Sequence, residues 1–297
     1  MHRAYHALTP LNGSDGSPIH VVFGFASVLL TILSEENPDY FAVAFDTKVP
    51  TFRKEKCPTY KAGRVKPSDD FYDQIPKVYQ MLDEILIKKI MVDGFEADDI
   101  LATLASKAEN SEEDLQTILV TSDRDALQLV DSKTVMHDLC GGYRQAKIYT
   151  PELVEARYGV KPSQFVDYKA LIGDNSDNLP GVNGIGPKGA EKLIQKYGDL
   201  AGIYAHLVEL TPAEKEKLEK SKDNAFFTRE MAQLRHDVPF EFAWQDLAVD
   251  GLGGSTAIDF LNKIGLHSIA NRLAILQKKK NKTIHTQSDQ SAQLSLF

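Results

Sequence analysis

The sequence predicts an α/β core followed by a mostly helical region, and three observations support this fold class. Apolar and aromatic runs at 40–45, 116–121 and 134–137 have the composition of buried parallel strands, and each leads into an aspartate. Helical patterns lie between these runs, an alternation that is typical of a parallel sheet flanked by helices. After about Thr150 the strand patterns give way to helices and loops.

The predicted helices follow in chain order. Apolar residues recur at helical spacing in three segments before Thr150, namely 21–33, 71–86 and 96–108. Thr150 followed by Pro151 has the pattern of a helix N-cap and first turn. A glycine-rich segment at 181–189 opens another helix, and two more are expected at 212–222 and 225–234. From Gln277 onward Lys, Ser, Gln and Thr predominate, which predicts a flexible tail.

Composition excludes several classes of protein. The 297 residues are 42% apolar and 26% charged, so the chain is not collagen-like, not a coiled coil and not disordered throughout. Two cysteines, Cys57 and Cys140, are too few for a disulfide framework or a zinc–thiolate site. The longest uncharged apolar run, 21–33, is too short to span a bilayer, and no signal peptide precedes it. We therefore expect a soluble protein of the cytoplasm.

Charge is distributed unevenly along the chain. The formal net charge is -8, with 34 Lys and Arg against 42 Asp and Glu, which by itself disfavours a nucleic-acid partner. Segment 47–66, however, carries seven basic residues and one acid, a local charge of +6 that leaves -14 for the rest of the chain. Such segregation is expected of a basic patch beside an acidic pocket.

Acidic residues gather where the predicted elements begin or end. Asp46 directly follows the first strand, and Asp123 and Asp125 follow the second after a single serine. Because ligands bind at the carboxyl ends of strands in open α/β sheets, we expect these side chains to converge. Further acids lie at a predicted helix start and in a tight loop, so the candidate set is Asp46, Glu96, Asp98, Asp99, Asp123, Asp125, Asp174 and Asp177.

The chemistry of this acidic set points to divalent ions. Any one of the acids is also typical of a helix cap or a turn. A converging group of ionised carboxylates, however, repels itself unless cations compensate it. Oxygen ligands without nearby His or Cys favour Mg²⁺ or Mn²⁺ over zinc. Two such ions are the usual equipment for displacement at phosphorus, so the set predicts a two-ion phosphodiesterase site.

Five motifs occur in an order that closely resembles the 5′→3′ exonuclease domain of bacterial DNA polymerase I, a member of the flap endonuclease superfamily. They are AFDTKVPTFR at 44–53, YKAGR at 60–64, GFEADD at 94–99, TSDRD at 121–125 and GDNSDNLPGVNGIG at 173–186. The resemblance implies a PIN-like nuclease core with a C-terminal helix-hairpin-helix region. It also implies hydrolysis of DNA at 5′ ends or flaps, for primer removal and repair, with the eight acids as metal ligands.

The same resemblance places segment 47–66 at the start of a helical arch beside a 5′-ended single strand. It implies that Lys61 and Arg64 hold the scissile phosphate and that Arg53 grips a neighbouring one. Phe52 and Tyr60 would offer ring faces to unpaired bases. The alternative for this segment is a solvated basic loop.

The glycine-rich segment at 181–189 resembles the family's helix-hairpin-helix. Gly181, Gly184 and Gly186 would let bare backbone N–H groups approach duplex phosphates, and Lys188 and Lys192 would add charge. The resemblance further implies a K⁺ ion bridging backbone carbonyls and phosphate. The alternative is a simple helix connector. A dinucleotide-binding loop is excluded because no strand-borne acid follows at the required distance.

The last five residues resemble the pentapeptide that anchors bacterial enzymes to the DNA sliding clamp. Leu294, Leu296 and Phe297 would fill an apolar groove while Gln293 makes polar contacts, and Ser295 completes the pentapeptide. The polar linker at 278–292 would act as a tether that raises the local concentration of nuclease. A tail end docked on the protein's own surface, or one without a role, is the alternative.

Family members begin with a strand that ends in a metal-binding aspartate and is followed by a short helix. Residues 1–8 resemble that helix, so the strand and its aspartate are missing from this sequence. Either they lie upstream of Met1, which we favour, or the chain lacks a sheet strand and one ligand. A chain without a central strand would expose an unpaired sheet edge and is expected to fold poorly.

We therefore expect a nuclease core with an arch at 1–149, a helical DNA-binding region at 150–276 and a tail at 277–297. The predicted function is a monomeric 5′ nuclease of the bacterial nucleoid that acts on branched or nicked duplex DNA. The sliding clamp is the expected protein partner, and no membrane is involved. Two rivals remain: a non-catalytic junction-binding protein recruited to the clamp, and a PIN-type ribonuclease, which needs neither arch nor hairpin.

Overall fold

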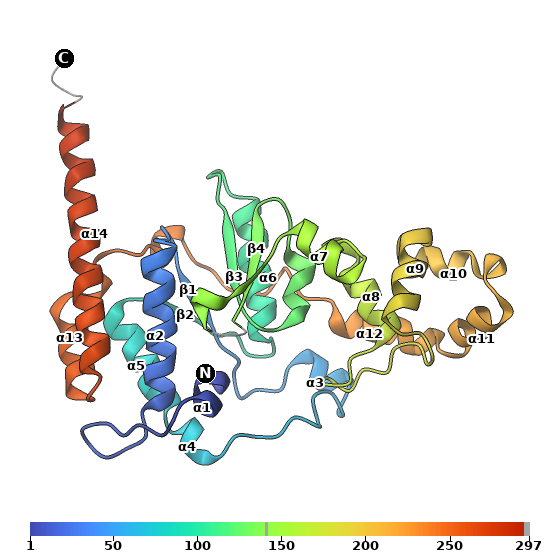
Figure 1. Cartoon of the computed structure of the whole chain (residues 1–297), viewed down its shortest axis with the longest axis horizontal. Coiled ribbons are helices and arrows are strands. Elements are labelled where there is room, and N and C mark those ends of the chain that lie inside the picture. The colour runs from blue at the N-terminus through green and yellow to red at the C-terminus, as the bar shows by residue number, and fades with distance from the viewer. Residues whose placement is uncertain (140–141, 294–297) are drawn as a thin grey trace. The chain divides into compact units, whose positions relative to one another are not determined.

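The computed structural model describes residues 1–139 and 142–293, with side chains described as far as residue 280. The chain divides into two compact units, both of which appear in Figure 1. Unit 1 comprises residues 1–43 and 66–90 with the described part of 241–297, and unit 2 comprises 44–65 and 91–240. Each unit is thus assembled from segments that are far apart in the sequence.

Unit 1 is a group of helices with two short paired strands. Its elements are α1 (His2–Ala7), α2 (His20–Glu35), β1 (Ala42–Ala44), α4 (Asp69–Tyr72), α5 (Ile75–Ile85), β2 (Lys88–Ile90), the 3₁₀ turns η5 (Trp244–Leu247) and η6 (Gly251–Gly253), α13 (Gly254–Lys263) and α14 (His267–Gln293). Helix α2 packs against α1, α5 and α14, and α13 packs against α5 and α14 (Figure 1). Apolar residues repeated along α2, among them Val22, Leu29 and Leu33, are buried in these contacts.

The helical predictions for unit 1 are confirmed with two differences. The segment predicted as one helix at 71–86 is divided into α4 and α5, and α5 ends where Leu86 adopts a left-handed backbone conformation. The backbone from Gln277 to Gln293, where composition predicts a flexible tail, continues helix α14. Lys and Gln are good helix formers, so polar composition alone does not exclude a helix.

Unit 2 contains a three-stranded sheet and a series of helices. Its elements are α3 (Phe52–Lys56), α6 (Ala97–Glu109), β3 (Thr117–Val120), η1 (Arg124–Leu129), β4 (Thr134–Asp138), η2 (Tyr143–Gln145), β5 (Lys147–Tyr149), α7 (Pro151–Tyr158), η3 (Pro162–Gln164), α8 (Phe165–Ile172), α9 (Pro187–Tyr197), α10 (Leu200–Ala205), η4 (Leu207–Glu209), α11 (Pro212–Lys220) and α12 (Lys222–Ala232). The helices α8, α9 and α12 pack together around one apolar core.

The sheet of unit 2 has the order β3-β4-β5. Strands β3 and β4 are parallel, with Thr117 opposite Thr134 and Val120 opposite His137, which confirms the predicted parallel pairing. Strand β5 is antiparallel to β4 and was not expected from the sequence. The first predicted strand pairs with β2 in a separate two-stranded sheet.

Two helix starts in unit 2 are fixed by capping side chains. The Thr150 hydroxyl accepts a hydrogen bond from the Leu153 N–H, and Pro151 follows as the first helical residue of α7, as the sequence predicts. Glu96 and Asp99 form a reciprocal capping box at the start of α6. Within the described chain, no helix has both the length and the hydropathy needed to cross a membrane.

Candidate active site

The predicted acidic residues lie at element ends within unit 2. Asp46 is the second residue after β1, and its Oδ1 accepts a hydrogen bond of 2.8 Å from the Ala97 N–H at the start of α6. Asp123 follows β3 and caps η1, where its Oδ1 accepts from the Asp125 N–H at 3.0 Å. The carboxyl end of β1, the end of β3 and the N-terminus of α6 therefore each bring an acid to the site.

Asp98 lies close enough to several other acids of this cluster for their charges to act on it. Burial raises the pKa of Asp98 to about 8, and the nearby carboxylates of Asp123, Asp125 and Asp46 add to the shift, while Lys61 opposes it. Burial likewise raises the pKa of Asp125 to about 6, with Lys169 opposing the shift and Asp123 adding to it. Carboxylates that repel one another in a partly desolvated site are short of positive charge.

The loop after α8 contributes the remaining acids. Asp174 and Leu179 exchange backbone hydrogen bonds of 2.9 and 2.8 Å, which closes the loop tightly. Lys169, on α8, forms ion pairs with both Asp125 and Asp174, the second at 2.7 Å, and thereby ties η1 to this loop. Burial is the largest single effect on Asp174 and raises its pKa, but the hydrogen bonds from Lys169 and Ser176 and the charge of Lys169 together outweigh it and lower that pKa to about 2.

Two cations of segment 47–66 form ion pairs with acids of the cluster. Lys61 Nζ pairs with Glu96 Oε1 at 2.7 Å, and Arg64 Nη2 pairs with Asp177 Oδ1 at 2.6 Å. The Tyr60 hydroxyl donates to the carboxylates of Glu96 and Asp177, each at 3.2 Å. Lys61 has a φ of 55°, an uncommon left-handed conformation for a residue other than glycine, and its N–H donates to the Asp177 carbonyl.

These pairs balance the cluster with the chain's own positive charges. Among the described residues, no group of three or more His, Cys, Asp or Glu side chains is arranged to hold a metal ion. The donor set nevertheless suits Mg²⁺ or Mn²⁺, because it consists of carboxylate oxygens and contains two acids whose pKa values are raised by burial and by neighbouring carboxylates. The residues therefore fit a divalent cation, provided that the lysine and arginine partners release them.

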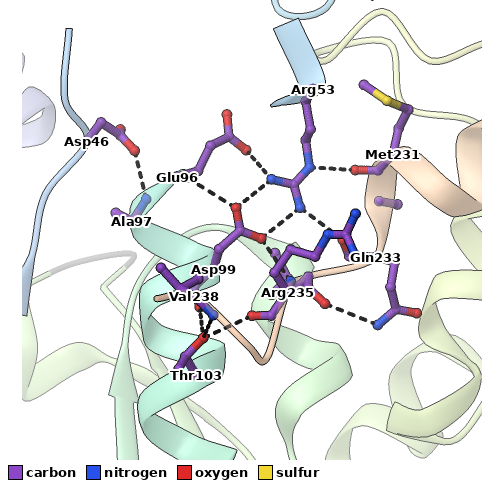
Figure 2. A network of polar contacts seen from close by, with 12 residues as sticks. Asp46, Arg53, Glu96, Ala97, Asp99, Thr103, Met231, Gln233, Arg235 and Val238 are labelled. Atoms are coloured by element: carbon purple, nitrogen blue, oxygen red, sulfur yellow. Dashed lines mark hydrogen bonds and ion pairs between the residues drawn. The ribbon is translucent and has the colours of Figure 1, made fainter. Parts of the chain in front are cut away.

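Two predicted site residues, Arg53 and Asp99, are paired with each other, and Arg53 also contacts Glu96 (Figure 2). Their side chains form a two-pronged ion pair of 2.7 and 2.8 Å, and the two residues are 1% and 0% exposed. A buried guanidinium is not available to a DNA phosphate, and a carboxylate whose oxygens are occupied is not available to a metal. The structure thus places Arg53 and Asp99 differently from the roles that the resemblance implies.

Tyr60 and Gly181 also differ from their expected roles. The Tyr60 ring is 4% exposed and packs with Leu179 and Met231, so its face is not open to an unpaired base. Gly181 is buried, with a φ of 62°, and a Cβ there would lie 2.3 Å from the backbone nitrogen of Gly173. This glycine is required by the close approach of two chain segments and not by an approaching phosphate.

The other predicted DNA-contacting residues lie near the surface. Phe52 is half-buried, with the guanidinium carbons of Arg53 and Arg235 at 4.5 and 4.9 Å from its ring centroid. Gly184 and Gly186 are exposed in the loop that enters α9, and so are Lys188 and Lys192 on the helix itself. The Gly184 carbonyl accepts a hydrogen bond from Lys217 Nζ at 3.0 Å, so an ammonium of the chain already occupies one loop carbonyl.

Lys169 was not found from the sequence, although a signal was present. It is a single lysine within the apolar segment 165–172, and it is only 6% exposed. Lysine is rarely buried unless it is paired, so its position predicts an acidic partner without saying which. The predicted clamp-binding residues Leu294–Phe297 lie outside the described residues, as does the side chain of Gln293.

Comparisons with known proteins found two family models that match consecutive parts of the chain. A family model described as "5'-3' exonuclease, N-terminal resolvase-like domain" matches residues 1–159, and one described as "5'-3' exonuclease, C-terminal SAM fold" matches residues 160–251. DNA polymerase I of Caldicellulosiruptor bescii is 36% identical over 291 residues, which is 97% of this chain and 34% of that protein. The thermostable DNA polymerase I of Thermus thermophilus is 37% identical over 280 residues, 94% of this chain and 32% of that protein.

The chain therefore spans about a third of the length of the curated relatives that it matches. Among solved structures, the T5 D15 protein co-crystallised with metal ions aligns with a TM-score of 0.62 at 19% identity, covering 86% of this chain and 91% of that one. A Rad2 catalytic core in complex with DNA substrate aligns with a TM-score of 0.57 at 17% identity, covering 93% and 88%. At these identities the likeness concerns the fold.

Proposed function

Because the chain belongs to the 5′-3′ exonuclease family, we propose that it hydrolyses DNA phosphodiesters at 5′ ends or 5′ flaps with the help of two divalent ions. The observation that carries this proposal is the gathering of Asp46, Asp123 and Asp125 around the partly desolvated Asp98. Removal of RNA primers and repair of gaps are the biological uses that such an activity would serve.

Seven carboxylates would hold the ions, directly or through water: Asp46, Glu96, Asp98, Asp123, Asp125, Asp174 and Asp177. Divalent ions bound there would lower the pKa of a nearby water molecule and offset negative charge at phosphorus. Asp123 and Asp125 are held in place by the η1 cap, and Asp174 by the closed loop after α8. The site is thus largely preformed by backbone geometry.

Lys61 and Arg64 would then change partners. In the structure they neutralise Glu96 and Asp177. Once divalent ions neutralise those carboxylates, the two cations are free to bind the phosphate that is to be cleaved. Arg64 is exposed and Lys61 is half-buried, so both have access to solvent on one side. Their short separation along the chain keeps them together at the cluster.

The loop into α9 would bind the duplex part of the substrate. Exposed Gly184 and Gly186 leave the N-terminus of an eleven-residue helix open to a phosphate, and Lys188 and Lys192 add positive charge. Such contacts carry no sequence information, as a nuclease that selects structure requires. A K⁺ ion at this loop belongs to the same proposal, as does anchoring of residues 293–297 to a sliding clamp.

A single set of incubations tests the proposed activity. The chain is mixed with a 5′-flap duplex, the unbranched duplex or single-stranded RNA, in Mg²⁺ or in EDTA. We expect flap cleavage in Mg²⁺, no cleavage in EDTA, and loss of cleavage in Asp123→Ala. The matched control is Asp93→Ala, which removes an exposed acid of the same unit and should cleave as well as the wild type.

The rival functions give different results in the same experiment. A junction-binding protein would retard the flap substrate in a gel in Ca²⁺ or Mg²⁺ and leave it intact. The pairing of Lys61, Arg64 and Lys169 with the acids favours this rival to the extent that the cations are not released. A PIN-type ribonuclease would cleave the RNA and spare the flap. Uptake of Mn²⁺, measured by calorimetry, tests the metal site independently of cleavage.

A further inference from the structure

We propose that the buried pair of Arg53 and Asp99 positions the start of helix α6, so that Glu96 and Asp98 face the metal pocket. The proposal rests on the proposed function, because it concerns how that pocket is assembled. In this view Asp99 is not a metal ligand and Arg53 is not a DNA contact. Both are positioning residues that act through their neighbours.

Asp99 has no capacity left for a metal ion. Its Oδ1 accepts from Arg53 Nη2 at 2.8 Å and from the Arg235 N–H at 2.9 Å. Its Oδ2 accepts from Arg53 Nη1 at 2.7 Å and from the Glu96 N–H at 3.1 Å. A carboxylate offers about four acceptor positions, so these four donors occupy the group completely. The bond from the Glu96 N–H is the capping bond that starts α6.

Arg53 is equally saturated, as Figure 2 shows. Besides the two bonds to Asp99, its Nη1 donates to Glu96 Oε2 at 3.2 Å, its Nε to the Met231 carbonyl at 2.8 Å, and its Nη2 to the Gln233 carbonyl at 2.9 Å. A guanidinium has about five N–H donors, and each has a partner here. A phosphate could bind Arg53 only after one of these bonds had broken.

The pair joins three segments that are remote in sequence. Arg53 belongs to α3, Asp99 to the first turn of α6, and the accepting carbonyls to the end of α12 and the residues after it. Asp98, the adjacent residue, is thereby directed to the side occupied by Asp123 and Asp125. Arg53 also contacts Glu96 itself, so one buried side chain holds a proposed ligand and the helix that carries another.

A role in stability alone does not account for this arrangement. Replacing a buried ion pair by apolar residues of similar size is often neutral or stabilising, so stability does not require the charges. The charged pair instead fixes the orientation of the groups around it, because the planar guanidinium sets the orientation of every group that it contacts. Outer partners of metal ligands generally have this role, and their loss weakens metal binding.

The test compares two double variants of the full chain by Mn²⁺ calorimetry. Arg53→Met with Asp99→Leu removes the pair without leaving an unpaired buried charge. The matched control, Arg229→Met with Asp167→Leu, removes another Arg–Asp pair of the same unit, at 2.6 Å between α12 and α8, that touches no proposed ligand. We expect the first variant to unfold cooperatively, to keep two ions, and to bind Mn²⁺ about 10- to 100-fold more weakly, and the control to bind as the wild type does.

Two single variants separate positioning from ligation. Asp99→Asn should keep two ions, whereas Asp98→Asn should bind fewer. Arg53→Lys should not have wild-type affinity, because an ammonium cannot make the two parallel bonds of the Arg53 guanidinium to Asp99. Wild-type Mn²⁺ affinity in the Arg53→Met, Asp99→Leu variant would overturn the positioning role, as would loss of an ion in Asp99→Asn. A wild-type chain that takes up no Mn²⁺ would refute the proposed function and this role with it.

Discussion

Asp98 and Asp99 are adjacent in sequence but have opposite surroundings. Asp98 is half-buried, and its burial together with the neighbouring carboxylates keeps its pKa high, whereas Asp99 is fully buried against a guanidinium. The same contrast separates Lys61 and Arg64, which reach the acidic cluster from the solvent side, from Arg53, which is fully buried and pairs with Asp99. The role of each of these residues therefore depends on the partner that its side chain contacts and not on its residue type.

The raised pKa of Asp98 predicts a cost in stability. The group ionises near 3.8 in the unfolded chain and near 8 in the folded chain, so between these values the folded state binds more protons. The stability of the metal-free protein should therefore fall as pH rises through this window. We expect Asp98→Asn to be more stable than the wild type at about pH 9, by on the order of 1–2 kcal/mol after allowance for solvent screening.

Urea unfolding at two pH values measures this difference. At a pH near 3.8 or below, where the wild-type group is protonated in the folded state, the two chains should be equally stable. The control, Asp93→Asn, should show no gain at either pH. Equal stability of wild type and Asp98→Asn at high pH would show that neither burial nor the neighbouring carboxylates raise the pKa of Asp98.

The same shifts predict that metal binding depends on pH. Carboxylates must lose their protons before they ligate a metal, and the pKa values of Asp125 and Asp98 are raised to about 6 and about 8. Mn²⁺ affinity should therefore increase as pH rises through this range, with release of protons. Calorimetry in two buffers of different ionisation enthalpy counts those protons, and a count of zero would contradict the prediction.

At the scale of elements, helices were predicted more successfully than strands. Helices α2, α6, α7 and α9 have clear periodicity or capping residues, and the structure confirms them. Strands β2 and β5 were missed because each has only three residues and begins with an exposed lysine that gives no strand signal. Pairing partners also could not be predicted, since the sequence near β1 does not show that it pairs with β2.

The loop between α8 and α9 predicts a local effect on stability. Gly181 has a φ of 62°, and an added Cβ would lie 2.3 Å from the Gly173 nitrogen, so Gly181→Ala should force these segments apart. We expect a loss of more than about 2 kcal/mol, because backbone strain and overpacking add. Urea unfolding measures it. The control is Gly63→Ala, where nothing lies within 4 Å, and a loss of similar size there would argue against the steric cause.

At the scale of the whole molecule, the site gathers acids from Asp46 to Asp177 into one of two interleaved compact units. Bringing such distant segments together lowers the conformational entropy of the loops, and the acids, which repel one another, do not offset this cost by themselves. The ion pairs with Lys61, Arg64 and Lys169 supply part of the compensation. The net charge of -8 accordingly says little about partners, because positive charge is concentrated where the acids are.

Divalent ions should stabilise the folded chain by mass action. A ligand at one hundred times its dissociation constant stabilises the state that binds it by about 2.7 kcal/mol. We therefore expect Mn²⁺ to raise the thermal midpoint of the wild type, EDTA to reverse the shift, and Asp123→Ala to show little of it. Scanning calorimetry measures the midpoints. An equal shift in Asp123→Ala would place the stabilising ion elsewhere on the chain.

The sequence by itself determined the class of the fold, the main helices and the family, because hydrophobic period, caps and ordered motifs are local properties of the chain. It also determined which acids lie at element ends. Only the tertiary structure decided which of them meet. Successive side chains on a helix point about 100° apart, so Asp98 and Asp99 cannot share a face. The side that faces the pocket depends on Arg53 and on the Arg235 N–H, which lies 136 positions away from Asp99 in the sequence.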